Sequence, residues 1–140
     1  MMKVVLDTDV VVAAMRSPTG ASAELIRTAR RQELTLAASV SLMMEYEAVC
    51  LHVEHMAAAG LDQRQVTVFL DAIAGFVKPV KVHFLWRPQL HDPADELVLE
   101  AAVNADADVL ISFNLRHFKV AVAKFNFRLD SPGTFLRSIR

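Results

Sequence analysis

The sequence is poor in cysteine, in long apolar runs and in net charge, and each shortage excludes a class of protein. Cys50 is the only cysteine, which excludes an internal disulfide and a metal site built from thiolates. No run approaches the ~18 uncharged apolar residues that a membrane-spanning helix requires. The 15 basic residues nearly balance the 16 acidic ones, so a nucleic acid would have to be held by a local basic patch or through a metal ion.

The chain also lacks internal repeats, low-complexity stretches and linkers. Its 140 residues are the length of one ordinary domain that can bury a core unaided. The first predicted strand begins at Lys3, which leaves no room for a signal peptide. We therefore expect a single domain over residues 1–140, in the cytoplasm and away from membranes.

Apolar residues are abundant and make up 54% of the sequence. The surplus has two explanations: a face buried between copies of the chain or against a partner, or a core rich in alanine and valine. Composition does not show which apolar residues are exposed, so both explanations stay open. If the surplus forms an interface, the chain is at least a dimer.

Short apolar runs alternate with segments of helical period along the chain. The predicted strands are Lys3–Asp7, Leu34–Ala38, a half-buried strand through Val80, Val82 and Phe84, then Val109–Ser112, and a last one through Phe125, Phe127 and Leu129. The predicted helices run from Asp9 to about Met15, over Ala21–Arg31, from Ser39 to near Gly60, from Asp62 to Val77, from Asp92 to Ala105 and from Ser131 onward. This alternation predicts an α/β fold, with a parallel sheet covered by helices on both faces.

Polar residues collect where predicted strands end and helices begin. Asp7 and Asp9 follow the first strand, and Asn114 follows a later one. Glu45 lies one to two turns into its helix, and Asp95 lies in the first turn of another. Because open α/β sheets bind ligands outside the carboxyl ends of their strands, we expect these side chains at one rim.

Clustered carboxylates repel one another unless a cation joins them or protons neutralise some of them. Oxygen ligands without histidine or cysteine favour hard cations, so Mg²⁺ or Mn²⁺ is the expected occupant. Such an ion can orient an attacking water and stabilise the leaving oxygen of a phosphodiester. The set therefore predicts metal-assisted phosphoryl cleavage.

Each member of the set also has a purely structural interpretation. Asp7, Thr8 or Asp9 could cap the helix that follows, and Asp95 could complement a helix dipole. Glu45 borders an apolar helix face. An acid in this position is either exposed to solvent at the edge of the face or drawn inward by a partner. The metal-site hypothesis therefore depends on the coincidence of these residues at one rim.

The same residues fit the pattern of a known family. The chain resembles the PIN-domain ribonucleases that serve as toxins in bacterial toxin–antitoxin pairs (VapC-like). The matching segments are Val4–Asp9, Ser39–Tyr46, Trp86–Pro88, His91–Glu96 and Ile111–Asn114. The resemblance implies a three-layer α/β/α sandwich with a central, mostly parallel sheet, commonly as a homodimer, with an antitoxin protein as partner.

The resemblance also implies roles for single residues. The family's acids would fall on Asp7, Glu45 and Asp95, which would hold Mg²⁺ or Mn²⁺ for cleavage of single-stranded RNA. The fourth catalytic position falls on Asn114, where the family often has aspartate; an amide offers an oxygen but cannot act as a base. Asp9 stands where asparagine is usual, so the two departures together keep the net charge of the rim.

Further residues are candidates for orienting the acids or contacting substrate. Ser112 resembles a hydroxyl position that orients the acids, and Thr8 and Arg116 are additional candidates of this kind. Trp86–Arg87 could stack on and clamp a nucleotide, although a lone tryptophan after a strand more often packs in the core. We do not expect His117 to bind the metal, because no other soft ligand is predicted at the rim.

Two other functions remain as alternatives. An apolar strand followed by Asp7-Thr8-Asp9 also fits a haloacid-dehalogenase-type phosphatase, in which the first aspartate is a nucleophile beside Mg²⁺. That family needs an acid pair after a later strand, and Phe113-Asn114 is not one. The other alternative is a PIN fold that only binds RNA or a partner protein, which Asn114 alone supports.

Overall fold

The computed structural model describes residues 1–83, 90 and 92–140. In this part of the chain five parallel strands form one sheet in the order β3-β2-β1-β4-β5. The strands are β1 (Lys3–Leu6), β2 (Thr35–Ala38), β3 (Lys78–Pro79), β4 (Val109–Ile111) and β5 (Arg128–Asp130). The helices are α1 (Thr8–Arg16), α2 (Ala21–Arg30), α3 (Val40–Cys50), α4 (Val53–Ala59), α5 (Gln63–Ala74), α6 (Pro93–Asn104), α7 (Leu115–Val122) and α8 (Pro132–Ser138).

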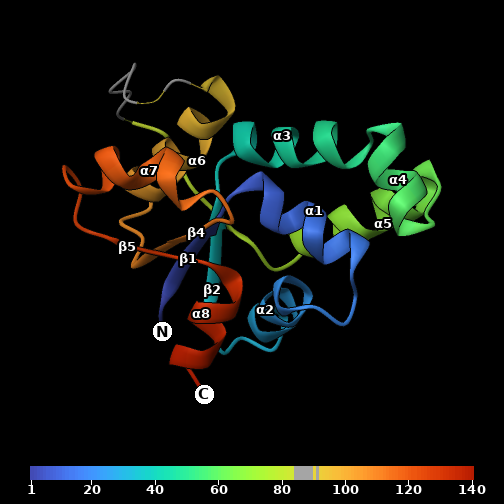
Figure 1. The fold of residues 1–140 in the computed structure, drawn as a ribbon, viewed down its shortest axis with the longest axis horizontal. Coiled ribbons are helices and arrows are strands. Elements are labelled where there is room, and N and C mark those ends of the chain that lie inside the picture. The colour runs from blue at the N-terminus through green and yellow to red at the C-terminus, as the bar shows by residue number, and fades with distance from the viewer. Residues whose placement is uncertain (84–89, 91) are drawn as a thin grey trace.

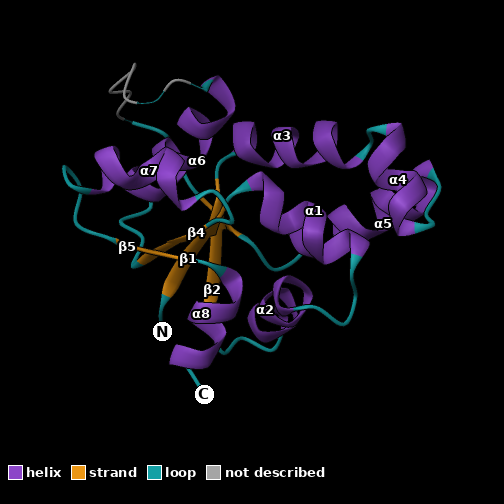
Figure 2. Cartoon of the chain, in the orientation of Figure 1, coloured by secondary structure: helices purple, strands orange, loops and turns teal. Residues whose placement is uncertain are grey.

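The helices cover the sheet on both sides, which confirms the predicted α/β sandwich (Figures 1 and 2). α6 packs on β1, β2 and β4, and α7 packs on β5 and α6. On the other side α2 packs between α1 and α8, and α1 also contacts α3 and α4. None of the helices in the described residues is long and apolar enough to span a bilayer.

β1 and β4 form the buried centre of the sheet. Val4–Leu6 are at most 3% exposed and Val109–Ile111 are fully buried, as in parallel strands covered on both faces. Leu6 lies opposite Ile111 in the strand register, so the two strands end at the same level. Asp7 and Ser112 therefore leave the sheet side by side.

Three predicted helix starts are confirmed. Ser39 caps α3 with its hydroxyl, and Asp92 caps α6 just before Pro93. Asp62 and Gln65 form a complete capping box at α5. Each cap satisfies backbone N–H groups that the first turn of a helix leaves without partners.

The helix predicted from Ser39 to near Gly60 is wrong, because two helices occupy this segment. α3 ends at Cys50, the chain turns at Leu51 and His52, and α4 begins at Val53. No glycine or proline stands at the turn to signal it. The change of direction brings α4 against α1, a tertiary contact that local periodicity does not reveal.

The predicted strand through Val80, Val82 and Phe84 is also wrong in the described residues. Only Lys78–Pro79 pair with β2, and the Val80 N–H donates to Ala38 O at 3.0 Å. Proline has no N–H to donate to a ladder, so this edge strand stays short. Phe84 and Trp86–Arg87 lie outside the described residues.

The end of the chain contains a helix that was not predicted. α7 buries Phe118 and Ala121 on one face, but it is short, and its N-cap Asn114 makes no side-chain capping bond that would mark its start. The last strand is shorter than predicted and spans Arg128–Asp130. α7 places His117 near the end of β4, which matters for the site.

Candidate active site

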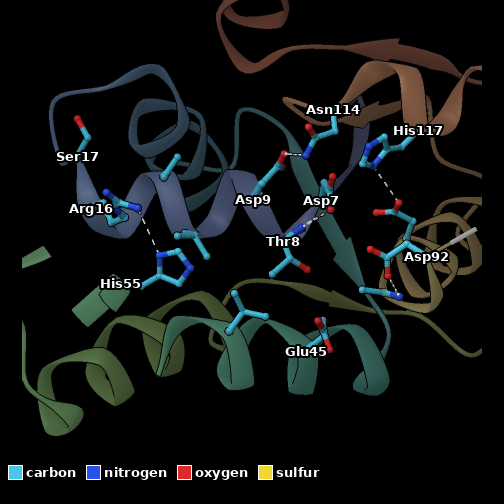
Figure 3. Close-up of a pocket in the computed structure, with 15 residues that line it drawn as sticks. Asp7, Thr8, Asp9, Arg16, Ser17, Glu45, His55, Asp92, Asn114 and His117 are labelled. Carbon is cyan, nitrogen blue, oxygen red and sulfur yellow. Dashed lines mark hydrogen bonds and ion pairs between the residues drawn. The ribbon is translucent and has the colours of Figure 1, made fainter. Parts of the chain in front are cut away.

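A cleft of about 570 Å³ opens at the carboxyl ends of β1 and β4. Its walls come from α1, α3, α4, α6 and α7. Asp7, Asp9, Glu45, Asp95 and Asn114 all line it (Figure 3). The structure therefore brings together the acids and the amide that the sequence predicts for one rim.

Asp7 is held by three different groups. Its backbone N–H donates to Ile111 O at 2.8 Å, which continues the β1–β4 pairing by one residue. One carboxylate oxygen accepts a hydrogen bond from the N–H of Thr8 at 2.7 Å, so Asp7 is also the cap of α1. The other accepts from Ser112 Oγ at 2.6 Å. The capping interpretation and the site interpretation of Asp7 are thus both compatible with its geometry.

Ser112 connects Asp7 to the chain after β4. Its side chain is fully buried. Its Oγ donates to Asp7 and accepts the N–H of Asn114 at 2.8 Å. A hydroxyl in this place fixes the rotamer of the carboxylate and the turn that carries Asn114 at the same time.

Asp9 and Asn114, the two residues that depart from the family pattern, contact each other. Asp9 Oδ2 accepts from Asn114 Nδ2 at 3.0 Å and from the N–H of Phe113 at 3.1 Å. Asp9 Oδ1 is buried and has no hydrogen-bond donor among the described residues. A proton, a water or a cation can satisfy this oxygen.

Asp95 is paired with His117, a residue that we did not expect to bind the metal. Asp95 lies in the first turn of α6 and is 9% exposed. His117 Nδ1 on α7 lies 3.1 Å from Asp95 Oδ2. His117, labelled in Figure 3, thus orients this acid from the side of the cleft. No local signal marks this contact, because it depends on α7.

Glu45 lies across the cleft from the other acids (Figure 3). It is half-buried on α3. The next residue, Tyr46, is buried and donates its hydroxyl hydrogen to Leu6 O at 2.5 Å. This bond ties α3 to the end of β1 and fixes how far Glu45 stands from Asp7.

Burial and mutual repulsion make the carboxyl groups of Asp7, Asp9 and Asp95 hard to ionise. The pKa of Asp7 is raised, chiefly by burial. Burial and then the charge of Asp7 raise the pKa of Asp9 to about 7. The pKa of Asp95 is raised by burial and by the charges of Asp7 and Asp92. A cation bound among these groups would neutralise the repulsion between their carboxylates.

The donor set suits a hydrated hard cation better than a tightly enclosed one. Among the described residues, no three His, Cys, Asp or Glu side chains stand close enough to hold one ion between them. Mg²⁺ keeps several waters and is usually held by one or two carboxylates together with substrate phosphates. The unpartnered Asp9 Oδ1 and the raised pKa values of the acids fit such an ion.

The remaining predicted residues are less clearly part of the site. Thr8 lines the cleft, and its hydroxyl is buried without a partner among the described residues. Arg116 is exposed on α7 and does not line the cleft. Arg16 and His55 do line it, and sequence reasoning missed both in this role. The only available signal was that Arg16 follows Asp9 by seven residues, two turns along the same helix face.

The parallel sheet and the acids at the ends of its central strands define an α/β protein with the PIN architecture. The PIN domain profile matches residues 3–116, and the chain belongs to the PIN-domain family. PIN domains are in general nucleases that use divalent metal ions.

The chain is also similar to one in the crystal structure of VapBC2 from Rickettsia felis bound to a DNA fragment from their promoter. The TM-score is 0.64 at 15% identity, and the match covers 91% of this chain and 98% of the other. The similarity is therefore one of fold. No match was found among curated proteins.

Proposed function

We propose that this protein is a metal-dependent endoribonuclease that cleaves single-stranded RNA with Mg²⁺ or Mn²⁺. The observation that carries the proposal is the gathering of Asp7, Asp9 and Asp95 in one cleft, each with a raised pKa. Keeping these carboxylates together without a cation costs free energy. Acids with strongly shifted pKa values in a cleft are typical of functional sites.

Asp7, Asp95 and Glu45 would hold the ion partly through its bound waters, because no three of these side chains stand close enough to ligate it directly. When bound, it would supply the positive charge that orients a water and stabilises the leaving oxygen of the phosphodiester. Ser112 keeps Asp7 in its rotamer, and His117 does the same for Asp95. Asp9, held by the Asn114 amide, adds a further carboxylate to the lining of the cleft.

We further propose that the protein is the toxin of a toxin–antitoxin pair, built as one PIN-like domain over residues 1–140. The pattern of the sequence and the similarity in fold to a VapBC2 chain support this proposal. Its partners would then be single-stranded RNA, an antitoxin protein and a second copy of the chain. The cytoplasm, which holds the RNA substrate, would be its place of action.

Cleavage of labelled single-stranded RNA by the purified protein tests the proposal. We expect cleavage with Mn²⁺ or Mg²⁺, none with EDTA, and a loss of at least ~100-fold for Asp95→Asn, since the metal would lose a charged ligand. Asp106→Asn, exposed just after α6, is the matched control and should cleave like the wild type, since asparagine also adopts the positive φ of this position.

Other outcomes would favour the alternative functions. Turnover of a small phosphomonoester without RNA cleavage would contradict the nuclease and favour a phosphatase. Metal-independent RNA binding without cleavage, unchanged by Asp7→Asn, would favour a PIN fold that only binds.

A further inference from the structure

The cleft has a second end that differs from the acidic one in charge. Beyond Asp7 and Asp9 it continues along α1 to Arg16, opposite His55 of α4 (Figure 3). Arg16 follows Asp9 by seven residues, which is about 10.5 Å along a helix axis at 1.5 Å per residue. One cleft therefore has carboxylates at one end and a cationic side chain at the other.

Arg16 and His55 contact each other in a way that leaves donors facing the cleft. Arg16 Nη1 lies 3.4 Å from His55 Nδ1. An arginine only donates, so we assign the acceptor role to Nδ1 and the ring proton to Nε2. Arg16 is exposed and forms no ion pair with an acid among the described residues. Both the guanidinium and the Nε2–H are thus available to an anion.

The cleft between these two ends is apolar. Val12 and Ala13 of α1 and Val49 of α3 line it. An apolar floor suits a ribose or a base, whereas a charged group would lose hydration there. The order along the cleft is therefore oxygen ligands, then an apolar surface, then cationic and hydrogen-bond donors, which matches the alternation of phosphate and nucleoside in a strand.

We propose that Arg16 and His55 bind a phosphate of the RNA strand close to the phosphate held over the carboxylates. This inference rests on the proposed function. Arginine is suited to the contact because its planar fork donates two hydrogen bonds to one phosphate. The contact also offsets the repulsion that Asp7, Asp9 and Asp95 exert on an approaching polyanion.

Fluorescence anisotropy with a labelled single-stranded RNA of randomised sequence measures the contact, with Ca²⁺ in place of Mg²⁺ to hold the strand. Arg16→Gln should weaken binding about tenfold, since a charge-assisted hydrogen bond is lost. The slope of log affinity against log salt should fall by about 0.7, the value for one phosphate contact on a single strand. Arg64→Gln, an exposed arginine on α5 outside the cleft, should change neither quantity.

His55→Ala provides a second, independent readout. The substitution removes one hydrogen-bond donor to the phosphate, so binding should weaken by about threefold. An oligonucleotide with one neutral methylphosphonate at a time locates the contact. The wild type should bind more weakly when one particular phosphate is neutralised. Arg16→Gln should not respond to the neutralisation of that phosphate, because the variant has already lost the contact.

The outcomes separate this inference from the proposed function. Cleavage by the wild type with unchanged binding by Arg16→Gln would overturn the inference alone. Binding that depends on Arg16, without cleavage under any metal, would overturn the nuclease and leave the subsite standing. Failure of the wild type to bind RNA would overturn both, as would a salt slope that Arg64→Gln lowers as much as Arg16→Gln.

Discussion

Asp9 and Asn114 show how two substitutions can preserve a site. By resemblance, the family usually has an amide at the first position and often an acid at the second. Here the acid and the amide have exchanged places, and a hydrogen bond of 3.0 Å joins them. The exchange keeps one negative charge on this side of the cleft, but moves it onto α1, next to Asp7. The cost is the raised pKa of Asp9, at about 7.

The pH dependence of stability follows from that pKa. In the folded, metal-free protein Asp9 keeps its proton to about pH 7, whereas the ordinary value is 3.8. The folded state then binds more protons than the unfolded one, so the stability from this group is present below pH 3.8 and is lost as pH rises to about 7. Asp7 and Asp95 shift in the same direction.

We therefore expect the melting temperature in EDTA to fall as the pH rises through this range. Asp9→Asn should make that fall shallower and should stabilise the metal-free protein at pH 8. Adding Mg²⁺ should raise the melting temperature of the wild type more at pH 8 than at pH 5, because the cation replaces the lost protons. Differential scanning fluorimetry over a pH series measures all three effects, and equal pH slopes for the variant and the wild type would contradict the assignment.

At the scale of elements, α3 carries Glu45, and the hydroxyl of Tyr46 ties this helix to the end of β1. Tyr46→Phe removes the bond from the buried hydroxyl to Leu6 O. We expect a loss of about 1–2 kcal/mol, the cost of an unmade buried hydrogen bond. Cleavage should fall through kcat more than through KM, because Glu45 loses its fixed distance from Asp7. Thermal melting and steady-state kinetics measure the two effects.

Ser131→Ala is the control for this experiment. It removes the cap of α8, which packs on α2 rather than on α3, and should cost about 1 kcal/mol. Its stability loss is then similar, while its kinetics should stay those of the wild type. An equal loss of kcat in both variants would mean that Tyr46 acts on stability alone.

The sequence predicted those elements whose signals are local. Strands with continuous apolar residues, such as Val4–Leu6, and helix starts with capping residues, such as Ser39 and Asp92, lie where expected. α7 and the turn after α3 were not predicted. α7 is short and has no side-chain cap at Asn114 to mark its start, and the turn at Leu51 serves a tertiary contact, the packing of α4 on α1.

The contacts of the site also fall into two groups, those that topology predicts and those that depend on elements the sequence did not reveal. Asp7 and Asn114 follow strands whose parallel register brings them together, so their proximity could be predicted from topology. The pairing of His117 with Asp95 depends on α7, which was not predicted. The meeting of Arg16 with His55 depends on the turn between α3 and α4. Where an element was missed, the contact that it makes was missed with it.

At the scale of the whole molecule, the abundant apolar residues lie partly in the core and partly on the surface. Alanine, valine and leucine fill most of the core. Yet Val40 and Met44, one turn apart on α3, are 73% and 66% exposed. Next to them a groove of about 260 Å³ runs between α3 and α5, lined by Met43 and Leu70 among others. Both explanations drawn from composition therefore have residues that support them.

We predict that the chain is a homodimer and that Val40 and Met44 lie at its interface. Two copies related by a two-fold axis would present this same face to each other, so one change acts twice. Met44→Glu should give a monomer in light scattering, because two buried carboxylates would face an apolar partner. Its fold should persist, since Met44 is exposed in the single chain. Val120→Glu, equally exposed at 70% but on α7, should remain a dimer, and a wild type that is monomeric at micromolar concentration would refute the prediction.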